Sequence, residues 1–256
     1  MGESTSVIER QPRQRRRSSG VVIAVIVAVV VAVLVVVADV ALRAYAENRA
    51  TAEITSSLPD TVRGDVDVKI SGFSFLQQYL SGTFDRVTLD APDLMVDGIP
   101  VDARVVATGV PTDFAKPVDA LSAELTLSED AVNSVVEVPG AASLALENQA
   151  IGYDGSISFL GLSLDYSVTA AVSVTADSVV LSPQTATLTA GTTVLDASDA
   201  LNAVLDESIP LCVASYLPSG VQLHHVSVVP GSATVTLDAS DFTLDEASLR
   251  SVGTCP

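Results

Sequence analysis

The longest apolar stretch in the chain runs from Val21 to Ala38. Its eighteen residues are Val, Ile, Ala and Leu, and eleven of them are Val. A helix of this length measures roughly 27 Å, close to the ~30 Å hydrocarbon core of a bilayer. Buried strands are also apolar, but they end after about 4 to 8 residues. The stretch therefore predicts a membrane-spanning helix, in which every backbone polar group is paired.

The charges on either side predict the direction of this helix. Five arginines lie between residues 10 and 17, whereas only Arg43 and Arg49 follow closely. Because positive flanks stay in the cytoplasm, we expect an Arg-rich cytoplasmic tail (residues 1–19), a transmembrane signal-anchor helix (20–39) and an exported domain (40–256). Ala44 and Ala46 leave signal-peptidase cleavage as an alternative, although the apolar stretch exceeds the usual length of about 7 to 15 residues in a signal peptide. In both cases the domain lies outside the cytoplasmic membrane.

Beyond this stretch a helical composition continues to Leu58, and Pro59 ends it. Most of the remaining chain alternates between apolar and polar residues, which is typical of half-buried strands. Between residues 162 and 174 the alternation predicts a strand longer than the usual ~5 to 6 residues. Turns are predicted at Asp97-Gly98, Ser182-Pro183 and Pro230-Gly231.

Three short helices interrupt the strands. One covers residues 75–80 and ends at Gly82, and two others begin at Ser128 and at Ser198, whose hydroxyls are good N-caps. The order of strands followed by a Ser-capped helix occurs twice, which is consistent with a structural duplication. We therefore predict an α+β fold, with a long, curved, largely antiparallel sheet wrapped around a few helices.

The helix at residues 75–80 lies in the most aromatic segment of the chain. With its flanks it holds four of the eleven Phe and Tyr residues. One interpretation is a helix that plugs one end of a β core. The other is that its apolar side lines or gates a cavity for a lipid. This apolar side consists of Phe75, Leu76, Tyr79 and Leu80.

Charge excludes some partners. Five of the 13 basic and two of the 31 acidic residues precede the apolar stretch, which leaves 8 basic and 29 acidic residues for the exported part. Such an acidic domain does not favour nucleic acid or a broad attraction to anionic lipid surfaces. The acidic residues alternate with apolar ones, so we expect them on the solvated face of strands.

Only two cysteines occur, Cys212 and Cys255, and both lie in the exported part. An even number of cysteines in an oxidising compartment predicts one disulfide. A metal site is a poor alternative because the only histidines, His224 and His225, would point to opposite faces of a strand. We expect neither a metal nor a cofactor.

Motifs that carry catalysis are missing from the sequence. It contains no G-x-S-x-G, P-loop, G-x-G-x-x-G or H-E-x-x-H pattern. A carboxylate pair for glycoside hydrolysis stays open, but the chain has no Trp to stack on a sugar. We therefore expect a protein that is not an enzyme.

The sequence resembles the LmeA family of actinobacterial cell-envelope proteins. The resemblance covers about residues 40–240 and is carried by three motifs. Ser74 and Gln77 stand where the family often has Pro and Thr. The motifs are Gly72-Phe73-Ser74-Phe75-Leu76-Gln77-Gln78-Tyr79-Leu80-Ser81-Gly82, Val87-Thr88-Leu89 and Leu217-Pro218-x-Gly220-Val221.

This resemblance implies binding of a phospholipid, notably of the phosphatidylinositol type, in an apolar groove. It also implies a fold like that of the tubular lipid-binding proteins. It implies support of lipoglycan elongation outside the membrane and no catalytic residue. One cation near the aromatic segment, among Arg63, Lys69, Arg86 and Arg104, is expected to meet the lipid phosphate, and Arg86 is our candidate. The other candidate lipid-contacting residues are Phe73, Phe75, Leu76, Tyr79 and Leu80.

Three functions follow from this reading. The first is a periplasmic, membrane-anchored domain that binds a phospholipid and supports envelope lipid or lipoglycan assembly. The second is an anchored scaffold that stabilises a membrane glycosyltransferase, and it predicts a filled core with an exposed apolar patch. The third is an envelope hydrolase, which predicts two carboxylates facing each other across a cleft.

Overall fold

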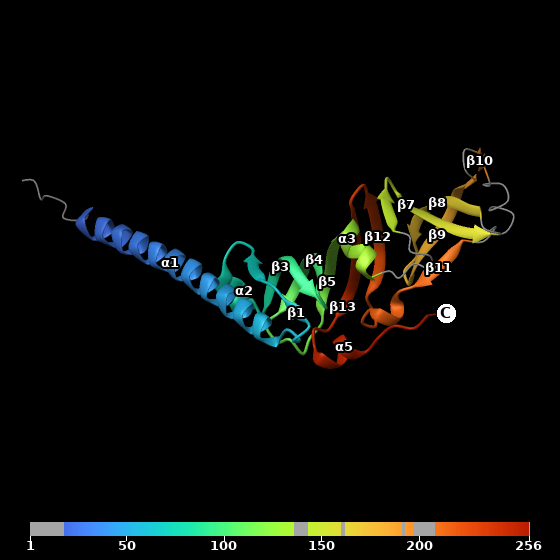
Figure 1. Cartoon of the computed structure of the whole chain (residues 1–256). Helices are drawn as coiled ribbons and strands as arrows, with labels where there is room; N and C mark the ends of the chain where they lie inside the picture. The colour runs from blue at the N-terminus through green and yellow to red at the C-terminus, as the bar shows by residue number, and fades with distance from the viewer. Residues whose placement is uncertain (1–17, 136–142, 160–161, 191–192, 197–207, 256) are drawn as a thin grey trace, which may run out of the picture.

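The computed structural model describes residues 18–135, 143–159, 162–190, 193–196 and 208–255. Its first element is α1 (Ser18–Ser57), a helix of 40 residues that runs without a break from the apolar stretch into the domain (Figure 1). In the described part of the chain, α1 is the one helix long and apolar enough to cross a membrane, and the domain buries none of its apolar segment. The prediction of a single helix leading from this segment into the domain is confirmed.

Two antiparallel sheets follow. The first has seven strands in the order β1-β3-β4-β5-β13-β12, with β2 also paired to β3. The C-terminal hairpin therefore returns to complete a sheet that begins directly after α1. The strands are β1 (Val62–Arg63), β2 (Asp67–Ser71), β3 (Thr83–Val96), β4 (Ile99–Pro111), β5 (Val118–Ser128), β12 (Gln222–Val229) and β13 (Ser232–Phe242).

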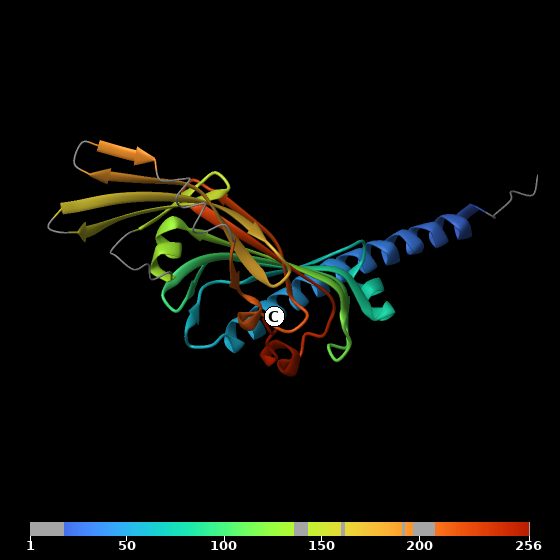
Figure 2. The ribbon, with the colours of Figure 1, turned by 90° about the vertical axis from the view of Figure 1, so that its right-hand side faces the viewer.

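The second sheet has six strands in the order β10-β9-β8-β7-β6, with β11 also paired to β9. It lies at the end of the domain away from the exposed part of α1 (Figures 1 and 2). The predicted α+β class is confirmed, but the strands are divided between two sheets. These strands are β6 (Leu144–Glu147), β7 (Ala150–Phe159), β8 (Leu162–Val174), β9 (Ser178–Ala190), β10 (Thr193–Asp196) and β11 (Ile209–Cys212).

Short helices lie between the strands. In α2 (Phe75–Ser81) the Ser74 hydroxyl caps the N-terminus, and Gly82 ends the helix with a φ of 85°. In α3 (Glu129–Val135) the hydroxyl of Ser128 accepts from the Ala131 amide, as the sequence predicts. The remaining elements are a 3₁₀ turn, η1 (Ala214–Tyr216), and α5 (Glu246–Arg250). The helix predicted after Ser198 lies outside the described residues.

Among the residues that the structure describes, the core consists of three apolar clusters. The C-terminal half of α1 packs through Ala50, Ile54 and Leu58 onto β2 and β3. A second cluster is formed by buried residues of β4, β5 and β13. The third joins the two sheets, where Leu223 and Leu146 belong to one buried group. The clusters therefore connect the helix, the first sheet and the second sheet in sequence along the molecule.

Two local predictions are wrong: the turn at Ser182-Pro183 and the unbroken alternation through His224 and His225. A β-bulge explains each of them. Ser182-Pro183 is not a turn, because β9 continues through it with a shifted register opposite Thr169 and Ala170. A second register shift occurs in β12 between Leu223 and His225. An extra residue moves the following side chains to the other face.

The shift in β12 changes which side chains are buried. Leu223, Val226 and Val228 all belong to the buried cluster, although strict alternation predicts that Leu223 faces away from the other two. His225 pairs with Thr236 and Gln222 with Asp238, so the bulge brings His225 to the face of Gln222, and the predicted opposite orientation of the two exposed histidines fails.

Cys212 and Cys255 lie at disulfide distance, with 6.0 Å between their Cα atoms. This pairing fits the sequence prediction and connects the segment after α5 to the end of β11. In the same segment, Val252 forms an isolated β-bridge with Pro218. The C-terminal segment is therefore held at two points.

Candidate functional site

The apolar face of the first sheet contains a groove of about 440 Å³. Fourteen residues line it, and every one of them is apolar. They come from α1, from four strands of the first sheet and from the region around α5. The lining residues are Ala50, Ile54, Val68, Ile70, Phe84, Val87, Leu89, Val105, Ala107, Val110, Phe114, Leu121, Leu244 and Leu249.

Strand register builds the floor of the groove. Ile70 pairs with Val87, Val87 with Ala107, and Ala107 with Leu121, so one apolar row crosses β2, β3, β4 and β5. Because side chains alternate along a strand, the residues two positions away form a parallel row on the same face. This second row contains Val68, Leu89 and Val105.

Two helices form the walls. Ala50 and Ile54 of α1 lie on one side, and Leu249 of α5 with the nearby Leu244 lies on the other. Phe114, in the loop between β4 and β5, also lines the groove and is exposed, as is Leu249. These two lining side chains are therefore open to solvent.

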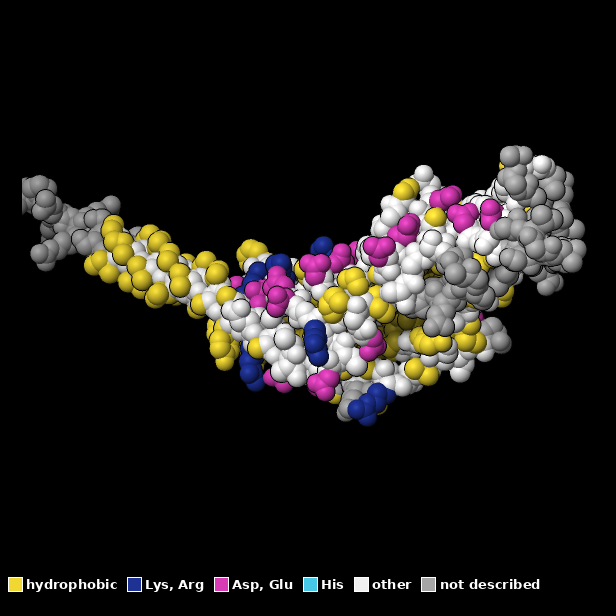
Figure 3. All heavy atoms as spheres, in the orientation of Figure 1, with side chains coloured by type: hydrophobic (Ala, Val, Ile, Leu, Met, Phe, Trp, Pro, Cys, Tyr) yellow, Lys and Arg dark blue, Asp and Glu magenta, His cyan; other side chains and the backbone are white. Residues whose placement is uncertain are grey.

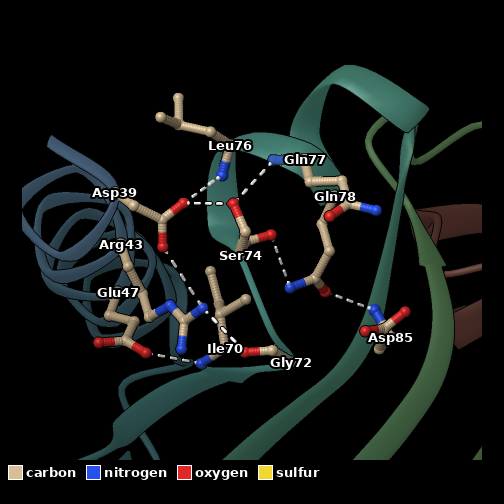
Figure 4. Close-up of polar contacts among 10 residues, drawn as sticks. All are labelled: Asp39, Arg43, Glu47, Ile70, Gly72, Ser74, Leu76, Gln77, Gln78 and Asp85. Atoms are coloured by element: carbon tan, nitrogen blue, oxygen red, sulfur yellow. Dashed lines mark hydrogen bonds and ion pairs between the residues drawn. The ribbon is translucent and has the colours of Figure 1, made fainter. Parts of the chain in front are cut away.

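Polar contacts hold the α1 wall in place (Figure 4). The Glu47 carboxylate accepts from the Ile70 amide at 2.7 Å, and the Thr51 hydroxyl accepts from the Val68 amide at 3.2 Å. Arg43 donates to the Gly72 carbonyl at 3.0 Å. The edge of β2 is therefore hydrogen-bonded by side chains spaced four residues apart on one side of the helix.

The opposite face of the same sheet carries both polar and apolar side chains. A shallow hollow of about 420 Å³ there is lined by residues that alternate with the groove residues, including Thr108, Ser122 and Asp238. Val106 lies on this face, whereas its neighbour Val105 lines the groove. The groove is therefore apolar throughout, whereas the hollow on the opposite face is lined by both polar and apolar side chains.

The aromatic segment predicted from the sequence lies beside the groove, and none of its five candidate residues lines it. Phe75 is buried, and its ring stacks on Phe84, a groove residue, with 5.5 Å between ring centroids. Phe73, Tyr79 and Leu80 are exposed. Whether these side chains contact a bound lipid stays a prediction.

The four candidate cations, Arg63, Lys69, Arg86 and Arg104, are all exposed, and none of them lines the groove. Arg86 is exposed and precedes Val87 on β3, so it points away from the groove face. Lys69 donates to Asp67 at 2.7 Å, and this hydrogen bond raises the pKa of Lys69. Arg104 lies 3.5 Å from Asp90. A contact between Arg86 and a lipid phosphate therefore stays a prediction.

Sequence reasoning missed the two helical walls. Ala50, Ile54 and Leu58 recur every four residues on α1, and this spacing was visible in the sequence as an apolar stripe. Leu249 carried no comparable signal because α5 is only five residues long. The groove lining also contains no titratable side chain, and in the described ranges no three metal-binding side chains cluster. The arrangement is suited to holding a hydrocarbon chain.

Comparison with known proteins identifies one family. A family model described as LmeA-like phospholipid-binding matches residues 37–238. The match begins at the end of the apolar stretch and extends into β13, so it covers most of the groove. No curated protein and no solved structure matches the chain.

Proposed function

Because the chain belongs to the LmeA-like phospholipid-binding family, we propose that it holds a phospholipid with an acyl chain in the groove of its first sheet. The observation that carries this proposal is the all-apolar lining of the groove. A lining without hydrogen-bonding groups has nothing to offer a polar ligand, whereas it excludes water from a hydrocarbon.

The size of the groove supports one acyl chain. A methylene group occupies about the volume of a water molecule, roughly 30 Å³, so 440 Å³ accommodates on the order of 15 such groups. Each methylene transferred from water contributes about 0.8 kcal/mol. Ten buried methylenes therefore contribute roughly 8 kcal/mol, which corresponds to micromolar affinity before the costs of association.

The finer features of this function are also proposals. We propose that residues 21–38 anchor the protein as a single-pass span with its N-terminus in the cytoplasm, and that the domain is extracytoplasmic. The exposed apolar segment of α1 supports the anchor, and the paired cysteines support an extracytoplasmic domain. The proposed cargo is of the phosphatidylinositol type, and the proposed role is envelope lipid or lipoglycan assembly, as the family resemblance implies.

We further propose that the protein is a binding protein and not an enzyme. A hydrolase acting on a groove-bound lipid needs a carboxylate, a nucleophile or a metal beside it, and the fourteen lining residues provide none. A pure scaffold needs no groove. The lining therefore favours the lipid-binding function over both alternatives.

Native mass spectrometry of the full chain, released from a mild detergent, tests this proposal. We expect an added mass equal to one phospholipid, and this mass identifies the lipid. Val105→Phe fills the groove and is expected to lower the lipid-bound fraction several-fold. Val106→Phe is the matched control because Val106 is also half-buried but lines the hollow on the opposite face of the same strand. A lipid-free mass after incubation with envelope lipids, or equal occupancy in both variants, would overturn the proposal.

A further inference from the structure

A second apolar surface lies outside the groove. Phe73, Tyr79 and Leu80 form an exposed group on and beside α2, which we call the α2 patch. Phe73 is 95% exposed and Leu80 is 83% exposed. Exposure of neighbouring large apolar side chains to this degree is unfavourable in water and marks a surface that another apolar phase covers.

The α2 patch is tied to the end of the apolar stretch. Asp39, the first residue after this stretch, has one carboxylate oxygen that accepts from the Ser74 hydroxyl at 2.7 Å and from the Leu76 amide at 2.8 Å (Figure 4). The N-terminus of α2 therefore lies directly beside the point where residues 21–38 end. Both ribbon views place α2 at the end of the domain nearest the exposed part of α1 (Figures 1 and 2).

The side of α2 that faces the first sheet is already packed, so the residues of the α2 patch cannot turn toward the sheet. Phe75 is stacked on Phe84, and the buried Gln78 hydrogen-bonds the Ser74 carbonyl and the Asp85 amide. Figure 3 shows hydrophobic side chains along the exposed part of α1 and further hydrophobic patches, among charged side chains, at the adjacent end of the domain. Leu42 and Tyr45 on this part of α1 are exposed as well.

We propose that the α2 patch inserts into the interface of the bilayer that α1 spans, and so holds the domain against the membrane surface. This inference rests on the proposed membrane anchor. Aromatic and large apolar side chains are favoured at the boundary between headgroups and acyl chains. The position of α2 agrees with this proposal. Asp39, which binds the N-terminus of α2, directly follows the span, and one helical turn rises only about 5.4 Å. The N-terminus of α2 therefore lies close to the level at which the span ends. The occupant of the patch is thus the lipid surface, distinct from the single lipid in the groove.

The absence of Trp from the chain provides a direct test. Phe73→Trp and Leu80→Trp each introduce one fluorescent reporter into the full chain. The protein is reconstituted in phosphatidylcholine vesicles that contain acyl-brominated phosphatidylcholine as quencher. Tyr216→Trp is the matched control, since Tyr216 is also 83% exposed but lies in η1, directly after β11 of the second sheet. Val31→Trp reports on the span itself.

We expect the reporters at positions 73 and 80 to emit at shorter wavelength than the reporter at 216 and to be quenched several-fold more strongly. The same result is expected when Val105→Phe fills the groove, because the quencher is the bilayer and not the bound cargo. Loss of quenching in that background would overturn the inference.

The remaining outcomes distinguish a failure of this inference from a failure of the proposed membrane anchor. Quenching at Val31→Trp without quenching at 73 and 80 would overturn the inference and leave the anchor standing. A blue shift at 73 and 80 without quenching would mean that a protein or a second copy covers the patch, which also overturns it. An unquenched reporter at position 31 would remove the anchor and the inference together.

Discussion

At the scale of single residues, a buried amide decides how α2 faces the sheet. The Gln78 side-chain nitrogen donates to the Ser74 carbonyl at 3.2 Å, and its oxygen accepts from the Asp85 amide at 2.7 Å. Gly72 makes room for this side chain, since a Cβ there, at a φ of 125°, would collide with Gln78 and Asp85. The helix therefore buries Phe75 and Gln78, and the other large apolar residues remain outside.

Gln78→Leu is expected to lower the free energy of unfolding by about 1 to 3 kcal/mol, because it leaves the Asp85 amide without its partner in a partly buried place. Gln77→Leu, one residue earlier on the exposed side, is expected to change it by no more than about 0.5 kcal/mol. Urea titration of both variants in detergent measures the difference. Equal losses in the two variants would contradict this account of α2.

At the scale of elements, α5 is too short to be stable alone, since isolated helices below about 12 residues are marginal in water. It forms one wall of the groove because Asp245 caps its N-terminus. The carboxylate accepts from the Ser248 amide at 2.7 Å. This amide and then the Ser248 hydroxyl lower the pKa of Asp245 from its usual value of 3.8.

The cap makes α5 sensitive to acid. A carboxyl whose pKa is lower in the folded state stabilises the fold above its usual pKa, and this contribution is lost as the pH falls through the lowered value. We expect the hydrogen-exchange protection factor of the Ser248 amide to be constant above about pH 5 and to fall at lower pH. Asp245→Asn keeps an acceptor at the cap without a titrating group, and its profile is expected to be flat. A wild-type profile that matches the Asn variant would refute this role of the carboxylate.

At the scale of the whole molecule, long-range pairings join parts that are far apart in the chain. β13 pairs with β5 along ten residue pairs, which closes the first sheet after the chain has built the second one. The cysteine pair then fastens the segment behind α5 to β11 in the second sheet. The groove wall formed by α5 is thus connected to both sheets.

Replacing both cysteines by Ser is expected to lower the free energy of unfolding by up to about 4 kcal/mol, since the chain-entropy model assigns that amount to a loop of this length. The sequence separation of Cys212 and Cys255 is 43 residues. A reductant should produce the same loss of stability in the wild type and none in the double variant. The double variant is therefore the control for other effects of the reductant. An unchanged wild-type stability under reduction would show that the pair does not stabilise the domain.

Patterns within a single segment were readable from the sequence. Eighteen consecutive apolar residues define the exposed part of α1 whatever surrounds them, and alternation identified the long strands, such as β4 and β8, but not the short strands β1, β6 and β11. Caps are also local, because a Ser hydroxyl at position 74 or 128 reaches an amide three residues away. These features depend on neighbours in the chain, so composition and periodicity are sufficient to predict them.

The tertiary structure alone decided how these segments meet. Bulges opposite Thr169 and at His224 shift the register in response to a partner strand, and alternation cannot show them. The groove exists because residues of β2, β3, β4 and β5 fall into rows that α1 and α5 enclose. The sequence by itself determined an anchor-like helix, a β-rich domain and its family resemblance. Which apolar side chains line a cavity and which remain exposed was set by pairings between distant segments.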